Sequence, residues 1–323
     1  MNIISIINKI RTQREAIKYL EKMRWGKKPI CPYCGSEKSS KVKTDFRYYH
    51  CCKCNRQFSV TVGTIFHDTR LPLKKWLLAM AIIANAKKGI SSCQLARDLK
   101  INQKTAWRIQ MQLRKAMQDK SQQQLMQGIV EVDECYIGGK KKKGDKKKDD
   151  DDNNINQRGR GTDKQGVIGA VERETGKVIA KKQDKFSFSS IKNFLSNVID
   201  FKKTTLYTDD FKSYRPFGKL LKHSIINHST HQYSMRGIHT NTVEGFWGLF
   251  KRSIIGAYHK LSVKYLDEYI NECCFKYNNR KENIFEILMR NALNLNCVYY
   301  GGVEKDDLRL AYVKGLRKGV VVG

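Results

Sequence analysis

The chain has 323 residues, and its 62 Lys and Arg against 31 Asp and Glu give a formal net charge of +31. This length suffices for about two domains with buried cores, and a hydrophobic content of 40% excludes a chain that is disordered throughout. No run approaches the roughly 18–20 apolar residues of a membrane span. Residues 1–25 acquire charge too early for a signal peptide, so we expect a protein that is neither secreted nor membrane-bound.

The positive charge is spread along the chain instead of being confined to one run. Residues 1–130 carry a net charge of +19, and residues 131–323 carry +12. The polyanion that best fits such a charge is nucleic acid, whose neutralised phosphates release counterions. The charge therefore predicts a nucleic-acid partner, without indicating which one or what is done to it.

The N-terminal segment, residues 1–28, places apolar side chains at helical intervals over residues 3–24. The pattern predicts one short amphipathic helix. We expect this helix to pack against a neighbouring element and to carry no chemistry of its own.

Cysteines are concentrated in residues 29–70, where two C-x2-C pairs are separated by sixteen residues. Thiolates at this spacing can meet on one tetrahedral Zn²⁺, and four of them leave no open position, so we expect a structural zinc ion. Alternation of aromatic and polar residues around the second pair is typical of the short strands of a zinc ribbon. Cys52 leaves an ambiguity, because it could replace Cys51 in the second pair. We prefer the C-x2-C set of Cys31, Cys34, Cys51 and Cys54.

Residues 71–120 predict helices over 73–88, 91–100 and 105–118, with Ser91 or Ser92 as an N-cap. Two short helices joined by a tight turn are typical of a helix-turn-helix unit. The last helix carries Lys104, Arg108 and Arg114, which we expect to contact DNA. A three-helix packing unit that binds no DNA is the alternative.

A polar linker over residues 121–128 leads into a region of strands and helices, residues 129–297. A low-complexity insertion of Lys and Asp, residues 140–161, interrupts it, and residues 298–323 form a C-terminal tail. The alternation of strands and helices predicts an α/β layered fold. The expected strands cover residues 128–139, 165–172, 177–182, 204–210 and 223–229, and the expected helices cover 188–199, 241–255, 262–279 and 284–295.

Three acidic residues stand out in this basic chain. Asp133 lies near the centre of an apolar strand, where a charge is costly unless it binds something. Asp209 is the last residue of a later predicted strand, where ligand-binding side chains often project in α/β sheets. Asp210 is the second candidate for this acid. Glu244 lies in the first turn of a predicted helix. Such carboxylates can hold the two divalent ions of a nuclease-like site.

Helical spacing puts Asn241 and Lys251 on the same face as Glu244. Each acid also has a purely structural alternative. Asp133 could be a charge that keeps an edge strand from aggregating with other strands. Asp209 could cap the helix that follows it, and Asn241 with Glu244 could form a capping box. The joint occurrence of the three acids, in the order strand, later strand and helix, favours the catalytic interpretation.

Six longer blocks of the sequence are distinctive: VEVDECYIGG, LYTDDFKSY, HTNTVEGFWGLFKRSIIGAYHKLS and YINECCFKYNNR, preceded by CPYCGS and CCKCNRQFSVTVGTIFHDTRLPLKKW. In these blocks the sequence resembles the ISXO-like insertion-sequence transposases, which are related to the Merlin DNA transposons. Together these blocks span roughly residues 15–290. Cys135 departs from the pattern, since Thr is usual at this position.

The resemblance implies an RNase H-like catalytic core, a mixed sheet flanked by helices, with a DDE acid triad that uses Mg²⁺ or Mn²⁺. Asp133, Asp209 and Glu244 match the three acids, with Asn241 as a second choice for the third. Lys251 matches a basic residue two helical turns after the glutamate, and with Arg252 it is expected to contact DNA.

The implied activity is cut-and-paste transposition: recognition of terminal inverted repeats, metal-dependent strand cleavage and strand transfer into target DNA. Double-stranded DNA and further copies of the chain are the implied partners. The expected location is the cytoplasm or nucleoid of a bacterium, or the nucleus of a eukaryote. An inactive or domesticated DNA-binding regulator and a nuclease without strand transfer are the alternatives.

Overall fold

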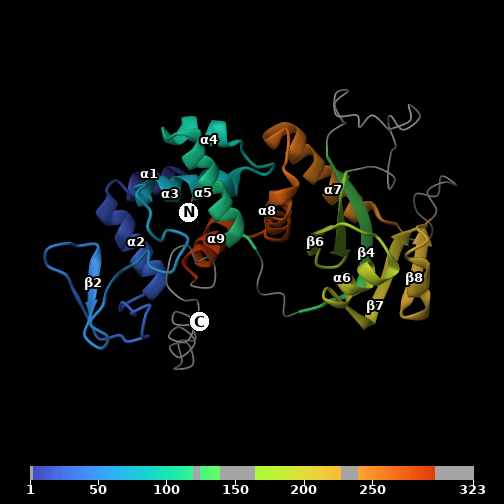
Figure 1. Cartoon of the computed structure of the whole chain (residues 1–323), viewed down its shortest axis with the longest axis horizontal. Helices are drawn as coiled ribbons and strands as arrows, with labels where there is room; N and C mark the ends of the chain where they lie inside the picture. The colour runs from blue at the N-terminus through green and yellow to red at the C-terminus, as the bar shows by residue number, and fades with distance from the viewer. Residues whose placement is uncertain (1–2, 119–123, 139–163, 227–238, 295–323) are drawn as a thin grey trace, which may run out of the picture. The chain divides into compact units, whose positions relative to one another are not determined.

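The computed structural model describes residues 3–118, 124–138, 164–226 and 239–294. The chain forms two compact units (Figure 1), one built from residues up to 118 and from 280 on, and the other from residues 119–279. The expected insertion at 140–161 and tail at 298–323 lie outside the described residues, as does the end of the strand expected at 223–229.

A small antiparallel sheet carries the cysteine-rich part of the first unit. An aromatic cluster packs beside it: the Trp25 ring stands edge-on to Tyr49 and Phe58, with centroids 5.6 and 5.7 Å away. Such pairs contribute about 0.5–1.5 kcal/mol beyond the burial of their surface. The order of the strands is β1-β2-β3. They are β1 (Ser39–Lys41), β2 (Tyr48–Cys51) and β3 (Gln57–Ser59).

The N-terminal segment forms two helices, α1 (Ile3–Lys9) and α2 (Gln13–Trp25), and the prediction of a single helix is wrong. Thr12 breaks the run, because its hydroxyl accepts a hydrogen bond from the backbone N–H of Glu15 at 3.2 Å. The Glu15 carboxylate accepts in return from the backbone N–H of Thr12 at 2.8 Å. This capping box starts a new helix at residue 13.

The helix-turn-helix segment has its three predicted helices. The Ser91 hydroxyl accepts from the N–H of Gln94 at 3.1 Å, and the Asn102 side chain accepts from the N–H of Thr105 at 2.7 Å. These caps satisfy donors that a helix start leaves unpaired. The helices are α3 (Leu73–Asn85), α4 (Ser92–Leu99) and α5 (Gln103–Ala116).

The helix α9 (Ile284–Leu293) belongs to the first unit, although we expected it at the end of a catalytic domain over residues 129–297. It packs against α3, and the backbone N–H of Ile65 donates to the carbonyl of Ala292 at 3.2 Å. The apolar period of α9 predicts a helix with a buried face, but periodicity does not specify the element that covers it.

The second unit is built on a five-stranded mixed sheet in the order β6-β5-β4-β7-β8. β4, β5 and β6 form an antiparallel meander, whereas β7 and β8 run parallel to β4. This mixed sheet agrees with the α/β fold expected from the sequence and with the RNase H-like core that the family resemblance implies. β4 begins inside the expected linker, and β7 begins five residues earlier than expected. The strands are β4 (Met126–Ile137), β5 (Gln165–Glu172), β6 (Val178–Gln183), β7 (Ile199–Asp209) and β8 (Lys222–Ile226).

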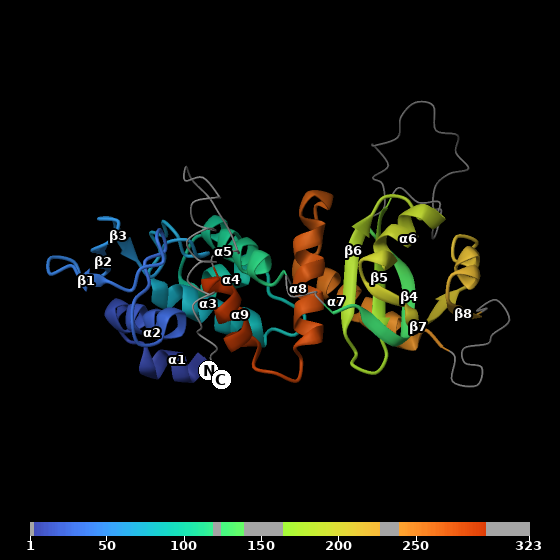
Figure 2. The same cartoon turned by 90° about the horizontal axis from the view of Figure 1, so that it is seen from below.

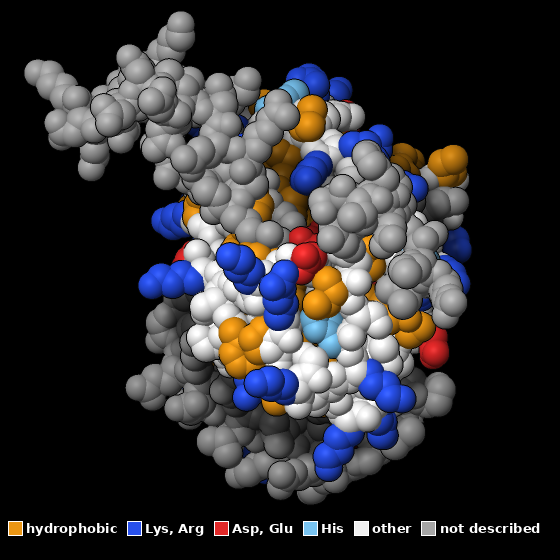
Figure 3. Space-filling model, turned by 90° about the vertical axis from the view of Figure 1, so that its right-hand side faces the viewer, with side chains coloured by type: hydrophobic (Ala, Val, Ile, Leu, Met, Phe, Trp, Pro, Cys, Tyr) orange, Lys and Arg blue, Asp and Glu red, His pale blue; other side chains and the backbone are white. Residues whose placement is uncertain are grey.

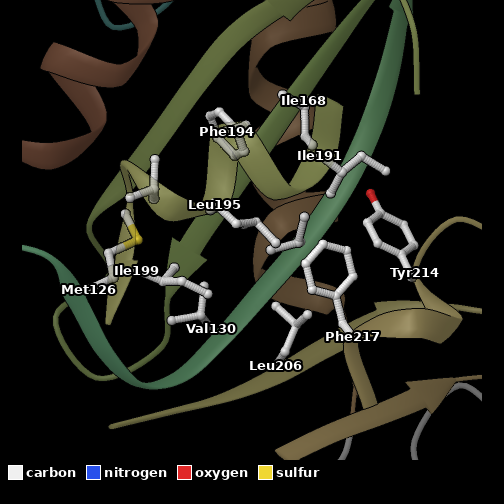
Figure 4. Packing of buried hydrophobic residues seen from close by; sticks show 13 residues of the cluster. Met126, Val130, Ile168, Ile191, Phe194, Leu195, Ile199, Leu206, Tyr214 and Phe217 are labelled. Atoms are coloured by element: carbon white, nitrogen blue, oxygen red, sulfur yellow. The ribbon is translucent and has the colours of Figure 1, made fainter. Parts of the chain in front are cut away.

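Helices cover both faces of this sheet (Figure 2). Because side chains alternate along a strand, Val130 and Val132 of β4 join the core on one face. Figure 4 shows Val130 in this core together with Leu195 and Phe217. Cys135 of β4 joins the other core. The first core packs against α6 (Phe188–Ser196) and the 3-10 helix η3 (Arg215–Lys219), and the second packs against α7 (Asn241–Ser253) and α8 (Leu266–Asn278).

Between α7 and α8 the chain makes a π-helical turn, η5 (Ile254–Tyr258), and a short 3-10 turn, η6 (Val263–Tyr265). The Tyr258 hydroxyl donates to the buried Glu272 carboxylate of α8 at 2.9 Å. Glu272 in turn pairs with Lys276 at 2.6 Å, so this turn is tied to α8. In the described ranges, none of the helices has the length and apolar character needed to cross a membrane.

Candidate active site and metal centres

Four thiol groups meet in the first unit. The Sγ atoms of Cys31, Cys34, Cys51 and Cys54 all lie within 4.8 Å of one another. Cys52 is exposed and outside the cluster, which resolves the ambiguity left by the sequence. The prediction of these four cysteines as one ligand set is therefore consistent with the structure.

The two C-x2-C pairs have the same backbone geometry. The N–H of Gly35 donates to the Cys31 carbonyl, and the N–H of Asn55 donates to the Cys51 carbonyl, both at 2.9 Å. Gly35 and Asn55 have φ values of 69° and 57°, a left-handed conformation that Gly and Asn adopt readily. Each turn directs two sulfur atoms inward, as tetrahedral coordination requires.

The environment of the cluster favours thiolate at one position. Burial tends to raise the pKa of Cys51, but the backbone N–H groups of Cys54 and Lys53 and the neighbouring thiols outweigh it and lower that pKa to about 7. At Cys31, burial dominates and raises the pKa. A bound dication would favour the deprotonated form of all four.

In the second unit, Asp133 and Asp209 lie on neighbouring parallel strands. Glu131 of β4 pairs with Tyr207 of β7, and two residues further along each strand come Asp133 and Asp209. Both side chains are half-buried. The alternative, Asp210, is exposed, and its carboxylate pairs with Arg215 at 3.0 Å. The structure therefore directs Asp209 toward Asp133 and engages Asp210 elsewhere.

Glu244 reaches the same region from α7, which packs against β4. Its carboxylate accepts a hydrogen bond from the Thr240 hydroxyl at 2.9 Å. Asn241, the first residue of α7, is exposed. The capping-box alternative for Asn241 and Glu244 does not describe this helix, because Thr240 is the N-cap residue and its side chain makes no capping bond.

The three acids influence one another electrostatically. The pKa of Asp133 is raised to about 7, mainly by burial and also by the charges of Glu134, Asp209 and Glu244. The backbone N–H of Glu134 acts in the opposite direction. Such crowding is unfavourable for the carboxylates alone and becomes favourable around a cation. The donor set therefore fits divalent metal.

The three carboxylates are less compactly arranged than the four thiols. Within the described ranges, the four cysteines are the only group of three or more Cys, His, Asp or Glu side chains whose ligand atoms all lie within 4.8 Å. Asp133, Asp209 and Glu244 therefore do not form such a compact group of ligand atoms.

Lys251 lies close to this group. Burial raises the pKa of Cys135 to about 11, and the nearby Lys251 ammonium opposes that rise. Cys135 follows Asp133 by two residues on the same face of β4. Lys251 and its neighbour Arg252 are exposed at the end of α7, where a phosphate group can approach them.

Two sequence profiles match this chain. The ISXO2-like transposase domain matches residues 125–278, and the transposase zinc-ribbon domain matches residues 11–57. Residues 125–278 are an ISXO2-like transposase domain. The transposase-domain match contains Asp133, Asp209 and Glu244, and the zinc-ribbon match contains all four clustered cysteines.

A curated relative also comes from a transposable element. The "uncharacterized protein in transposable element ISH50" of Halobacterium salinarum is 27% identical over 248 residues, which are 75% of this chain and 83% of the relative. Among solved structures, the pre-cleavage Mos1 transpososome matches 70% of this chain and 80% of its own, with 13% identity and a TM-score of 0.24. That TM-score is too low to indicate a shared arrangement, so the family assignment depends on the sequence matches.

The transposase domain contains an acid that the sequence did not single out. Glu134, next to Asp133, points to the opposite face of β4 and accepts a hydrogen bond from the Tyr214 hydroxyl at 2.9 Å. Tyr214 is fully buried (Figure 4), and burial, reinforced by the Glu134 charge, raises its pKa. Strand alternation places Glu134 away from the other acids, so spacing alone gave no reason to select it.

The expected DNA-contacting residues of α5 differ in exposure. Lys104 and Arg108 are exposed one helical turn apart. Arg114 is only 2% exposed, and its guanidinium contacts the Met111 sulfur at 3.4 Å. The expectation that Arg114 contacts DNA is therefore wrong for this structure, because its side chain faces the core.

On the face shown in Figure 3, Lys and Arg side chains are scattered and acidic side chains are few.

Proposed function

We propose that this chain is a DDE transposase that cuts DNA at the ends of its element and joins the freed ends to target DNA. The observation that carries the proposal is the convergence of Asp133, Asp209 and Glu244 within an ISXO2-like transposase domain. A strongly basic chain has no structural reason to crowd three carboxylates. The net charge of +31 suits double-stranded DNA as the partner.

In this proposal, Asp133 and Asp209 hold divalent ions, Mg²⁺ or Mn²⁺, and Glu244 completes the set. When bound, the ions would activate the attacking hydroxyl and stabilise the leaving oxygen. The Thr240 hydroxyl orients Glu244 through their 2.9 Å hydrogen bond. Lys251 contacts a phosphate near the cut. Asn241 remains the second choice for the third position.

The first unit acts as the reader of the terminal inverted repeats. Zn²⁺ held by the four cysteines fixes the ribbon, since closed tetrahedral sites are structural. Lys104 and Arg108 are exposed on α5, where they can contact the DNA backbone, with Arg252 as a further contact in the catalytic unit. Phosphate contacts set position, whereas contacts to base edges set sequence. Pairing of two ends requires more than one copy of the chain.

The test uses purified protein with labelled terminal-repeat DNA, target plasmid and Mg²⁺, beside Asp133→Ala and Glu244→Ala. A transposase gives cleaved ends and joined product, and either substitution abolishes both. Binding without cleavage by the wild type would identify a regulator, and cleavage without joining would identify a nuclease. Cleavage that survives both substitutions would contradict the site.

A further inference from the structure

We propose that the buried Glu131 and the half-buried Arg173 form a clamp that sets the spacing of the three acid-bearing elements. This inference rests on the function proposed above, because it concerns how Asp133, Asp209 and Glu244 are held in position. Neither residue touches the reacting atoms, so both are positioning residues.

Glu131 caps α7 from the neighbouring strand. One carboxylate oxygen, Oε2, accepts from the backbone N–H groups of Thr242 and Val243 at 2.9 and 3.0 Å. The other, Oε1, accepts from the Thr242 hydroxyl at 2.8 Å. α7 has no side-chain cap from its own N-cap residue, so this carboxylate supplies the acceptors and the negative charge that a helix N-terminus favours.

Arg173 completes the pairing of Glu131. Its Nε and Nη2 atoms lie 2.9 and 2.8 Å from Glu131 Oε1. Nη2 also donates to the backbone carbonyl of His239, just before α7, at 2.8 Å. The guanidinium lies over the ring of Tyr207, 4.9 Å from its centroid, and Tyr207 belongs to β7.

The clamp therefore joins the three elements that carry the acids. Glu131 precedes Asp133 by two residues on β4, and Tyr207 precedes Asp209 by two residues on β7. The capped N–H of Val243 directly precedes Glu244 on α7. A shift of any of these elements would disturb at least one of the contacts, so the clamp opposes changes in the separation of the acids.

Both oxygens of Glu131 are occupied, and its side chain is 0% exposed. Because these contacts use both oxygens, Glu131 supports the elements that carry the metal-binding acids and is not a further metal ligand. A fully buried carboxylate requires such pairing, because an unpaired charge in the interior is very unfavourable. Gln in its place would keep the shape but lose the charge and one acceptor oxygen.

The experiment measures Mn²⁺ affinity by calorimetry and single-turnover cleavage of terminal-repeat DNA, on full-length Glu131→Gln and Arg173→Lys. Loss of a group that orients metal ligands lowers metal affinity or activity about 10–100-fold. We expect a loss of that size in both variants, with the Kd for terminal-repeat DNA unchanged within about twofold. Glu174→Gln, an exposed glutamate beside Arg173, is the matched control and should behave as the wild type.

A merely structural role gives a different pattern. Variants with a lower Tm that bind Mn²⁺ and cleave like the wild type at a temperature where they are folded would overturn the clamp. Arg173→Lys keeps the positive charge but loses the planar fork, so it remains informative if Glu131→Gln does not fold. The variant Asp133→Asn distinguishes a failure of the clamp from a failure of the proposed function. If the wild type neither binds Mn²⁺ more tightly than Asp133→Asn nor cleaves, the proposed function fails together with the clamp.

Discussion

The indole of Trp247 on α7 occupies the space that a side chain at Gly169 on β5 would fill. A Cβ added to Gly169 would lie 2.7 Å from the Trp247 ring. Gly169 is also the residue paired with Asp133 in the antiparallel β4–β5 ladder. The close approach of the helix to the sheet thus occurs beside the first acid, and the glycine makes it possible.

Gly169→Ala should therefore lower the free energy of unfolding by about 1–3 kcal/mol, because the added methyl group overpacks a filled core. Urea denaturation measures the change. Gly245→Ala, on the same helix with nothing but the local helix itself within 4 Å of the added Cβ, should not destabilise, since Ala has the higher helix propensity. Equal effects of both substitutions would show that the contact with Trp247 is unimportant.

The raised pKa of Asp133 predicts how stability depends on pH in the absence of divalent metal. The folded-state pKa is about 7, whereas an unfolded Asp has a pKa of about 3.9. Between these values the folded state binds more protons, so its stabilisation is complete below about pH 4 and is lost as the pH rises through 7. Asp133→Asn should remove this contribution.

Urea unfolding at pH 5, 6 and 7 in EDTA-treated buffer, with zinc retained in the protein, provides the measurement. Over this interval the wild type should lose about 1 kcal/mol more per pH unit than Asp133→Asn. Parallel pH profiles of the two proteins would mean that the Asp133 carboxyl is not crowded as the structure indicates.

The cysteine cluster predicts opposite outcomes for two adjacent residues. Cys51→Ser removes a ligand from the cluster, and it should lower the zinc content and the affinity for terminal-repeat DNA, since zinc binding and folding are coupled in small domains. Cys52→Ser changes an exposed thiol outside the cluster and should leave both unchanged. Metal analysis and a DNA-binding titration distinguish the two, and equal zinc content in both variants would refute the ligand assignment.

Lys104 and Arg108 of α5 should contribute to the salt dependence of DNA binding. Each lost phosphate contact reduces the slope of log K against log salt concentration by about 0.9, so Lys104→Gln with Arg108→Gln should reduce it by about 1.8. Lys202→Gln, an exposed lysine on β7, serves as the control. An unchanged slope in the double variant would indicate that α5 does not contact the DNA backbone.

Local patterns in the sequence predicted the individual elements well. Cysteine spacing identified the ligand set of the ribbon, and strand alternation correctly placed Glu131 and Asp133 on one face of β4. Helical spacing put Lys251 on the face of α7 that carries Glu244, and in the structure the Lys251 ammonium is near enough to Cys135 to oppose the rise in the pKa of that thiol. These features depend on residues that lie close together in the sequence, so their spacing can be recognised without knowledge of the three-dimensional structure.

Features that depend on distant partners were not predictable. The bond from Val243 to Glu131 joins residues 112 positions apart, and the backbone bond from Ile65 to Ala292 brings α9 into the first unit. Arg114 resembles a surface residue in the sequence, yet it is buried by its neighbours. The start of α2 is a different case, because the Thr12–Glu15 capping box was present in the sequence.

The most direct test of the proposed catalytic site compares two adjacent aspartates. Single-turnover cleavage of terminal-repeat DNA in Mg²⁺ should fall to background in Asp209→Asn, because that carboxylate faces Asp133. Asp210→Asn, which disturbs only the exposed pair with Arg215, should cleave at a rate near that of the wild type. Cleavage by Asp209→Asn at the wild-type rate, or its loss only in Asp210→Asn, would contradict the assignment of the site.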